Sequence, residues 1–109
     1  MRTLKFIVDN QLIEKDPKCD FDGLVPGTEG YLRAEFSFSP EWKDCLKVAA
    51  FFSAAGKEYT PQVLQDGKYC IIPVEACEKR DISIRVIGKK GGFRITTNTI
   101  VVRQNGGKV

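Results

Sequence analysis

The residues best suited to chemistry in this sequence are its four cysteines and a few clustered carboxylates, because the chain contains no histidine. Without histidine the chain has no Ser-His-Asp triad, no Cys-His pair and no histidine general base near neutral pH. The cysteines are Cys19, Cys45, Cys70 and Cys77, and none forms the Cys-x-x-Cys pair typical of structural zinc sites. We therefore expect reduced thiols that pack as small apolar groups, with no metal and no cofactor.

Carboxylates gather in one turn-rich stretch and again near residue 75; they are Asp16, Asp20, Asp22, Glu75 and Glu78. Paired carboxylates can act as a general acid and a nucleophile or base, as in glycosidases. The first three could also gather calcium, but their spacing does not match a twelve-residue loop closed by a glutamate. Acidic residues among turn formers more often shape turns or face solvent. We expect no catalytic residue and no enzymatic activity.

One predicted turn has two adjacent lysines, Lys89 and Lys90, with Arg85 and Arg94 nearby. This turn resembles a phosphate cradle only superficially, since the chain continues into a strand and not into a helix N-terminus. No row of exposed aromatic residues accompanies it, which disfavours a nucleic-acid site. The net charge of +3 arises from 17 basic and 14 acidic side chains that alternate along the chain, so no polyanionic partner is indicated.

The elements that would position these residues are organised around residues 69–102. Residues 81–88 alternate, with Ile82, Ile84 and Val86 on one face, as in a half-buried strand. The Lys-Lys-Gly-Gly turn at 89–92 suits a tight hairpin, because glycine adopts positive φ without strain. Residues 93–102 return as a β-branched strand whose alternation is interrupted at Asn98. The pattern predicts a strong antiparallel hairpin.

The rest of the chain reads as short strands with turn signals between them. Strands are predicted over residues 3–9, 11–15, 31–39, 47–53, 58–61 and 69–72, and single helical turns near 39–42 and 73–79. The strand at 47–53 is apolar on both faces, which indicates a central position in its sheet. The sequence therefore predicts an all-β fold, an immunoglobulin-like antiparallel β-sandwich of about seven to eight strands.

Length and composition indicate one domain over residues 1–109, with 42% hydrophobic and 28% charged residues. The long loop at 16–30 is rich in Gly, Pro and Asp, and its apolar anchors are Phe21 and the Leu24-Val25 pair. Such a loop is either functional or pinned across the mouth of the core, and its apolar residues favour pinning. The polar tail at 104–109 is expected to fray. The apolar run at the N-terminus is too short for a signal peptide or a membrane span.

Trp42 is the single tryptophan, and it follows the end of a predicted strand. It would either cover the end of the sandwich as a core residue or anchor a protein partner. The candidate partner-binding residues are Trp42, Lys89, Lys90, Phe21 and Tyr59. A weaker alternative is sugar binding on an exposed face, for which Tyr31, Tyr59 and Tyr69 are the available aromatic residues.

The segments Gln62–Ala76 and Ile82–Asn98 resemble the small β-sandwich domains of tailed-bacteriophage structural proteins. They are similar in particular to N-terminal domains of baseplate or tail-fibre proteins from phages of Gram-positive bacteria. The shared pattern is a strand, an Ile-Pro-x-Glu-Ala turn, a strand that ends in glycine, and a hairpin whose second strand carries Thr-Thr-Asn. The resemblance implies a role in the virion or its assembly. No fibre shaft or receptor-binding tip follows in this sequence, which ends at Val109.

Two hypotheses follow from different functional classes. The first is a small virion-associated structural protein of the tail, baseplate or head-fibre type, for which we expect a homo-oligomer and an open sheet edge or apolar patch. The second is a phage-encoded inhibitor that binds a host protein such as a bacterial immune effector. In both, the partner is a protein: another copy, another phage structural protein or a host protein. We expect no small-molecule substrate and no membrane, and a location in the virion or the host bacterial cytoplasm.

Overall fold

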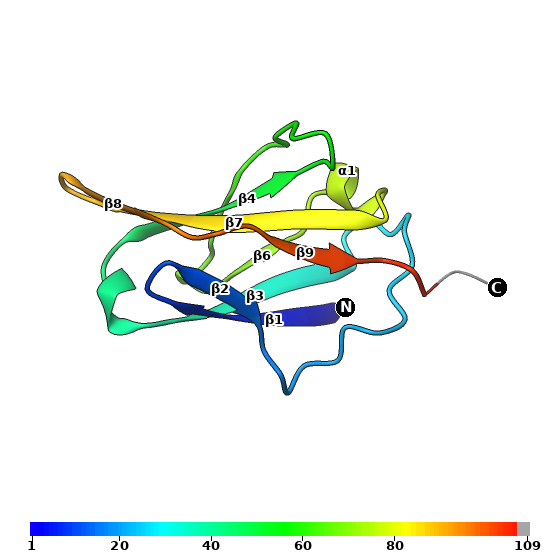
Figure 1. Cartoon of the computed structure of the whole chain (residues 1–109), viewed down its shortest axis with the longest axis horizontal. Coiled ribbons are helices and arrows are strands. Elements are labelled where there is room, and N and C mark those ends of the chain that lie inside the picture. The colour runs from blue at the N-terminus through cyan, green and yellow to red at the C-terminus, as the bar shows by residue number, and fades with distance from the viewer. Residues whose placement is uncertain (107–109) are drawn as a thin grey trace.

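The computed structural model describes residues 1–106 and arranges them as two β-sheets packed in layers (Figure 1). The first sheet has the strand order β2-β1-β3-β6, and the second has the order β5-β4-β7-β8 with β9 also paired to β7. The strands are β1 (Arg2–Asp9), β2 (Leu12–Lys15), β3 (Leu32–Phe38), β4 (Leu46–Phe52), β5 (Gln62–Val63), β6 (Tyr69–Ile71), β7 (Asp81–Lys90), β8 (Phe93–Thr96) and β9 (Ile100–Arg103). Two short helical turns, η1 (Pro40–Trp42) and α1 (Val74–Cys77), complete the elements.

The core lies between the two sheets and follows the predicted alternation. Alternate residues of β1, β3 and β7 point inward and are buried; among them are Leu4, Phe6, Val8, Leu32, Ala34, Phe36, Ile82, Ile84 and Val86. β4 is central in its sheet, as predicted, and both helical turns form where expected. The predicted edge strand at 58–61 is shifted: Glu58 makes one isolated bridge, and the strand itself is β5.

Tight turns form at the predicted hairpins. Asn10 has a φ of 53° and connects β1 to β2, while Gly91 has a φ of 59° and connects β7 to β8. Both are positive-φ positions, which asparagine and glycine tolerate better than other residues. The β7–β8 hairpin is therefore confirmed.

The prediction of a purely antiparallel sandwich is wrong, because β1 and β3 pair in parallel from Arg2 opposite Leu32 to Val8 opposite Phe38. A tight hairpin cannot connect parallel neighbours. The chain first forms the β1–β2 hairpin and then crosses the end of β1 through the long loop before it enters β3 on the other side. The result is a mainly β, sandwich-like protein of two sheets with one parallel pair.

The long loop is pinned, as its apolar residues indicated. Leu24 is 2% exposed and Phe21 packs against the core, whereas Val25 is 47% exposed, so Leu24 and Phe21 anchor the loop and Val25 does not. The Arg2 guanidinium donates to the carbonyl oxygens of Asp20 and Asp22 at 3.0 and 2.6 Å. The Gly27 amide donates to the carbonyl of Cys77 at 2.9 Å. These bonds hold the loop against the start of β1 and the end of α1.

Asn98 connects the two sheets along one side of the molecule. Its side-chain oxygen accepts a hydrogen bond from the Ile13 amide of β2 at 2.8 Å, and its own amide donates to the Gln11 carbonyl at 3.0 Å. The residue thus takes the place of a strand partner for β2. This explains why the alternation fails at Asn98, and why the predicted strand 93–102 divides into β8 and β9.

The tail is ordered further than predicted. Gln104 is 1% exposed, and its amide nitrogen donates to the carbonyl oxygens of Cys77 and Lys79 at 2.9 and 2.7 Å. The Gly106 amide donates to the Leu24 carbonyl at 2.8 Å. Fraying is therefore wrong for residues 104–106, because Gln104 satisfies carbonyls at the end of α1. The remainder of the predicted frayed tail, residues 107–109, lies outside the described residues.

Candidate protein-interaction surface

The β7–β8 hairpin extends beyond the body of the two sheets at one end of the molecule, which measures 48 × 30 × 21 Å (Figure 1). β7 is the longest strand at ten residues, and its last residues pair with β8 up to the contact of Lys90 with Phe93. Lys89, Lys90, Phe93 and Arg94 are all exposed in this projecting segment. The hairpin therefore presents three cations and one aromatic ring to solvent.

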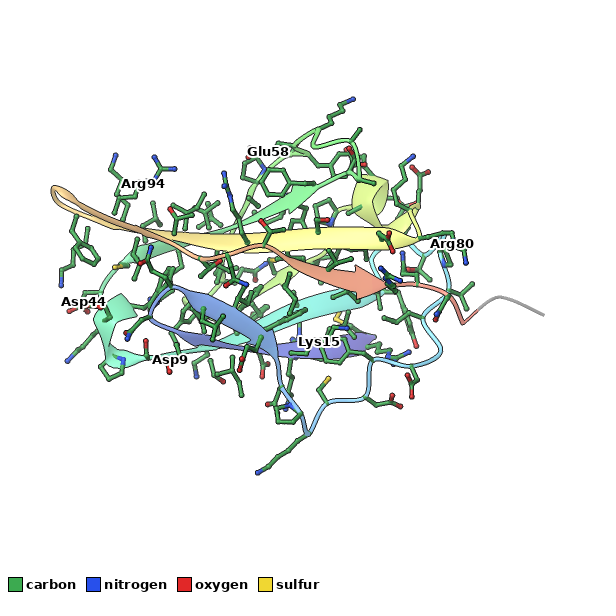
Figure 2. All side chains as sticks on the ribbon, in the orientation of Figure 1. Asp9, Lys15, Asp44, Glu58, Arg80 and Arg94 are labelled. Atoms are coloured by element: carbon green, nitrogen blue, oxygen red, sulfur yellow. The ribbon has the colours of Figure 1, made fainter. Side chains whose placement is uncertain are left out.

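Strand register divides these side chains between the two faces of the hairpin. Gly88 faces inward over Trp42, so Lys89 faces outward, and its cross-strand partner Arg94 shares that face. Leu46 of the neighbouring strand β4 is the other cross-strand partner of Lys89, shares its outward face and is 59% exposed. Figure 2 shows Arg94 on the hairpin at the end of the molecule where Asp44 also lies.

The outward face of the five-stranded sheet continues this surface with apolar side chains. Val48 pairs with Val63 on one side and with Ile87 on the other, and it lies two residues from Leu46 on the same face. Val63 is 59% exposed, and both Val48 and Ile87 are half-buried. We call this surface the outer patch: Leu46, Val48, Val63 and Ile87, bordered by Lys89 and Arg94.

The border of the outer patch is positively charged and free to interact. Within residues 1–106 the ion pairs are Arg33 with Glu35 and Arg103 with Asp81, so none involves Lys89 or Arg94. Contiguous exposed apolar residues rimmed by charged ones are typical of protein-binding surfaces. The outer patch therefore has both parts of an interface, an apolar centre and a charged rim.

Trp42 is 0% exposed, so it is not an anchor on an exposed surface. Its indole Nε1–H donates to the Asn10 carbonyl at 2.8 Å, and its ring lies 5.1 Å from that of Phe38. The ring also packs directly beneath Gly88 of β7. The geometry is that of a core residue at the end of the sandwich, because a buried aromatic ring with its polar atom satisfied has no free face.

The other predicted binding residues are dispersed. Lys89 and Lys90 lie together on the projecting hairpin, as their sequence proximity requires. Phe21 is half-buried and packs edge-on against Phe6 in the other sheet, with ring centroids 5.5 Å apart. Tyr59 is half-buried against the core, and its amide donates to the Phe51 carbonyl at the far end of β4 from the hairpin. The structure therefore does not bring Phe21 or Tyr59 to the outer patch.

None of the four apolar residues of the outer patch was predicted from the sequence as a binding residue; they are Leu46, Val48, Val63 and Ile87. The available signal was the run at 48–52, which is apolar on both faces and indicated a central strand. In a two-layer protein such a strand packs on the core with one face only, so apolar residues on its other face, such as the half-buried Val48, stay partly open to solvent.

The three tyrosines considered for sugar binding lie in different places. Tyr31 is 47% exposed beside the long loop, whereas Tyr59 is half-buried near the end of β4. Tyr69 lies beneath the Arg33 guanidinium, 4.8 Å from its ring centroid, on the outer face of the four-stranded sheet. They do not form one aromatic platform.

The four cysteines are free thiols, of which only Cys19 is not buried. Among residues 1–106, no group of three or more potential ligand side chains lies close enough to hold a metal ion. Burial raises the pKa of the Cys70 thiol from 9.0 to about 12, and it also raises the pKa of Cys77. Cys70 therefore remains a neutral thiol across the physiological range.

The pKa of Cys70 predicts a loss of stability at alkaline pH. The native thiol ionises near pH 12 and the unfolded thiol near pH 9.0. The contribution of this group to the free energy of unfolding is therefore complete below pH 9.0 and is lost as the pH rises toward 12. Between about pH 8 and about pH 10.5 this group alone should lower the free energy of unfolding by about 2 kcal/mol. Urea unfolding in reducing buffer at both pH values tests this. Between the two pH values the free energy of unfolding of Cys70→Ala should fall by less than that of the wild type. Cys19→Ala is the matched control and should keep the wild-type decline; an equal decline in Cys70→Ala would contradict the assignment.

Comparison with known proteins finds no match, either to a protein-family model, to a curated protein or to a solved structure. What the structure itself establishes is a small two-sheet β-rich domain. None of its helices, over the part of the chain described, has the length and apolar character needed to cross a membrane.

Proposed function

We propose that this protein is a non-catalytic binding domain that recognises another protein through the outer patch. The observation that carries the proposal is the placement of Leu46 and Val63, each 59% exposed, on one sheet face beside Val48 and Ile87. Exposing these side chains costs free energy that a partner would recover by covering them, at roughly 25 cal/mol per Å² of apolar area. An apolar centre of this kind is a usual location for interface hot spots.

The border of the outer patch indicates the chemistry of the partner. Lys89 and Arg94 lie on the same face as Leu46, and Lys90 follows at the tip of the hairpin. Complementary charge steers association and excludes partners of like charge. We therefore propose a partner that presents an apolar surface flanked by carboxylates.

The biological setting belongs to the same proposal. A virion-associated structural protein would use the outer patch to dock on another phage component, and an inhibitor would use it to cover a host protein. The immunoglobulin-like relationship rests on the number of predicted strands and the spacing of turn signals, and the phage origin rests on the sequence resemblance. An exposed apolar sheet face and a projecting hairpin are compatible with both settings, since the fold does not decide between them.

The test is a double substitution, Leu46→Glu with Val63→Glu. Both positions are exposed, so we expect the free energy of unfolding to change by less than about 1 kcal/mol. Partner binding should fall by at least about 100-fold, because two charges would be buried in an apolar interface. The readout is the set of proteins retained at stoichiometric amounts from bacterial lysate, with light scattering on a sizing column to detect self-association.

The matched control is Val74→Glu, which places the same charge at an exposed valine of α1 outside the outer patch. The control should retain every partner that the wild type retains. If the double variant is monomeric where the wild type is oligomeric, the partner is a second copy. Retention of the same partner by a folded double variant would disprove the proposed surface.

A further inference from the structure

A groove of about 440 Å³ opens along the edge of β3, between that strand and the start of β4, at the same end of the molecule as the hairpin. The half-buried side chains of Phe38 and Lys47 lie on its floor, above the buried rings of Phe36 and Trp42, and Glu35 and Ser37 of β3 also line it. Its rim contains η1, the segment after it and the turn at 66–68. The volume lies in the range of small-ligand and short-peptide sites. Lys47 faces inward while Leu46 and Val48 face outward, so this groove is separate from the outer patch.

One wall of the groove is an open strand edge. β6 pairs with β3 only from Arg33 to Glu35. Beyond Glu35 the neighbouring segment is the turn that connects β5 to β6, and it leaves the edge of β3. The Phe36 amide still donates to the Lys68 carbonyl at 2.8 Å, whereas the Ser39 amide donates to Val8 of β1. Backbone amides alternate in direction along a strand, so the Phe38 amide points to the same side of β3 as the Phe36 amide, toward the groove. No strand within residues 1–106 pairs with Phe38 on that side.

The floor of the groove contains a cation without a carboxylate partner. The Lys47 ammonium donates to the Cys45 carbonyl at 3.3 Å and lies 5.3 Å from the centre of the Phe38 ring. Among residues 1–106 no carboxylate oxygen lies within 4.0 Å of it. An ammonium has three donors, so Lys47 retains donors for an incoming oxygen anion.

We propose that this groove binds the extended C-terminal segment of a partner protein, whose terminal carboxylate pairs with Lys47. The backbone of that segment adds to the open edge of β3 at Phe38, which is the β-augmentation mode of peptide recognition. The terminal carboxylate is held by charge-assisted hydrogen bonds, which are stronger than neutral ones.

Two features favour a chain terminus over an internal acidic segment. The open edge is short, because Pro40 has no amide hydrogen and η1 begins there, so it accommodates only the end of a strand. The lining also contains Glu35, Asp44 and Asp66 beside Lys43 and Lys68, so acids outnumber bases around Lys47. A segment with several acidic side chains would meet repulsion at the rim, whereas one terminal carboxylate can pair with Lys47 on the floor.

The test uses a tetrapeptide of alternating threonine and valine, acetylated at its N-terminus and prepared both as the free acid and as the C-terminal amide. Binding to the full chain is followed by amide chemical shifts in NMR titrations. We expect the free acid to shift the Phe38 and Ser39 amides and to bind about tenfold more tightly than the amide. Lys47→Met preserves the length of the side chain and should lower the affinity for the free acid to that for the amide.

Lys43→Met is the matched control, since Lys43 lies on the rim and is exposed. It should leave the preference for the free acid unchanged. The proposal would be overturned by equal affinity for acid and amide in the wild type, by shifts confined to the outer patch, or by no shifts at about 1 mM peptide. Because the acid–amide comparison is made on the wild type, it does not depend on the folding of any variant.

Discussion

Trp42→Ala is expected to lower the free energy of unfolding by about 3–5 kcal/mol, the usual cost of removing a fully buried aromatic side chain. Trp42 is 0% exposed, contacts Phe38, and packs under β7 at Gly88. The substitution would leave a cavity where both sheets meet η1. It would also leave the Asn10 carbonyl without its hydrogen bond from the indole, at 2.8 Å in the wild type. Chemical denaturation by urea measures the loss directly.

Trp42→Phe separates the two contributions. Phenylalanine keeps most of the ring but cannot donate to Asn10, so this variant should lose only about 1–2 kcal/mol. If Trp42→Ala folds with wild-type stability and loses only partner binding, then Trp42 acts as a surface anchor and its assignment to the core is wrong. Because Trp42 supports the base of the β7–β8 hairpin, its loss should also weaken binding through the outer patch.

Much of the fold could be predicted from the sequence because local signals and tertiary contacts agree. Period-two alternation located β1, β3 and β7, and turn residues located the hairpins. The parallel pairing of β1 with β3 could not be predicted in this way. Alternation specifies which face of a strand is buried but not which neighbour it acquires, and that choice depends on contacts distant in sequence.

Two polar residues account for the other differences between the predicted and the observed structure. The tail is polar enough to suggest fraying, yet Gln104 is buried because its amide satisfies two carbonyls beside α1. Asn98 interrupts the alternation of a strand, but it hydrogen-bonds to β2 in place of a strand partner. A polar side chain that replaces backbone pairing leaves no periodic pattern in the sequence, so a segment that contains one is predicted to be a loop.

The candidate site was only partly predictable for a related reason. Lys89 and Lys90 were selected because they lie in a predicted tight turn, and the structure exposes them there. Leu46 and Val63 come from strands that are not adjacent in sequence, and only the register across β4 brings them onto one face. An exposed apolar residue resembles a core residue in sequence, so the outer patch becomes visible only once the layers are placed.

Gly88→Ala is expected to destabilise the protein by about 1–3 kcal/mol, although alanine normally suits a strand better than glycine. A methyl group at this position would lie 2.7 and 2.8 Å from two carbons of the Trp42 ring and 3.1 Å from Ile95. These distances are shorter than van der Waals contact. The hydrogen bond from the indole Nε1–H to the Asn10 carbonyl holds the ring in this position. Glycine is therefore required here for close packing of strand on ring, and not for its backbone freedom.

A double-mutant cycle with Trp42→Ala tests this cause. Removing the ring creates the space that the new methyl group needs, so Gly88→Ala should cost nothing or stabilise the protein in that background. The coupling free energy between the two sites should reach about 1–3 kcal/mol, whereas unrelated sites add within about 0.5 kcal/mol. Gly92→Ala is the control and should show no coupling, because a methyl group added at Gly92 of the same hairpin would have no neighbouring atom within 4 Å. An additive cycle at Gly88 would mean that the cost comes from the strand itself and not from the buried ring.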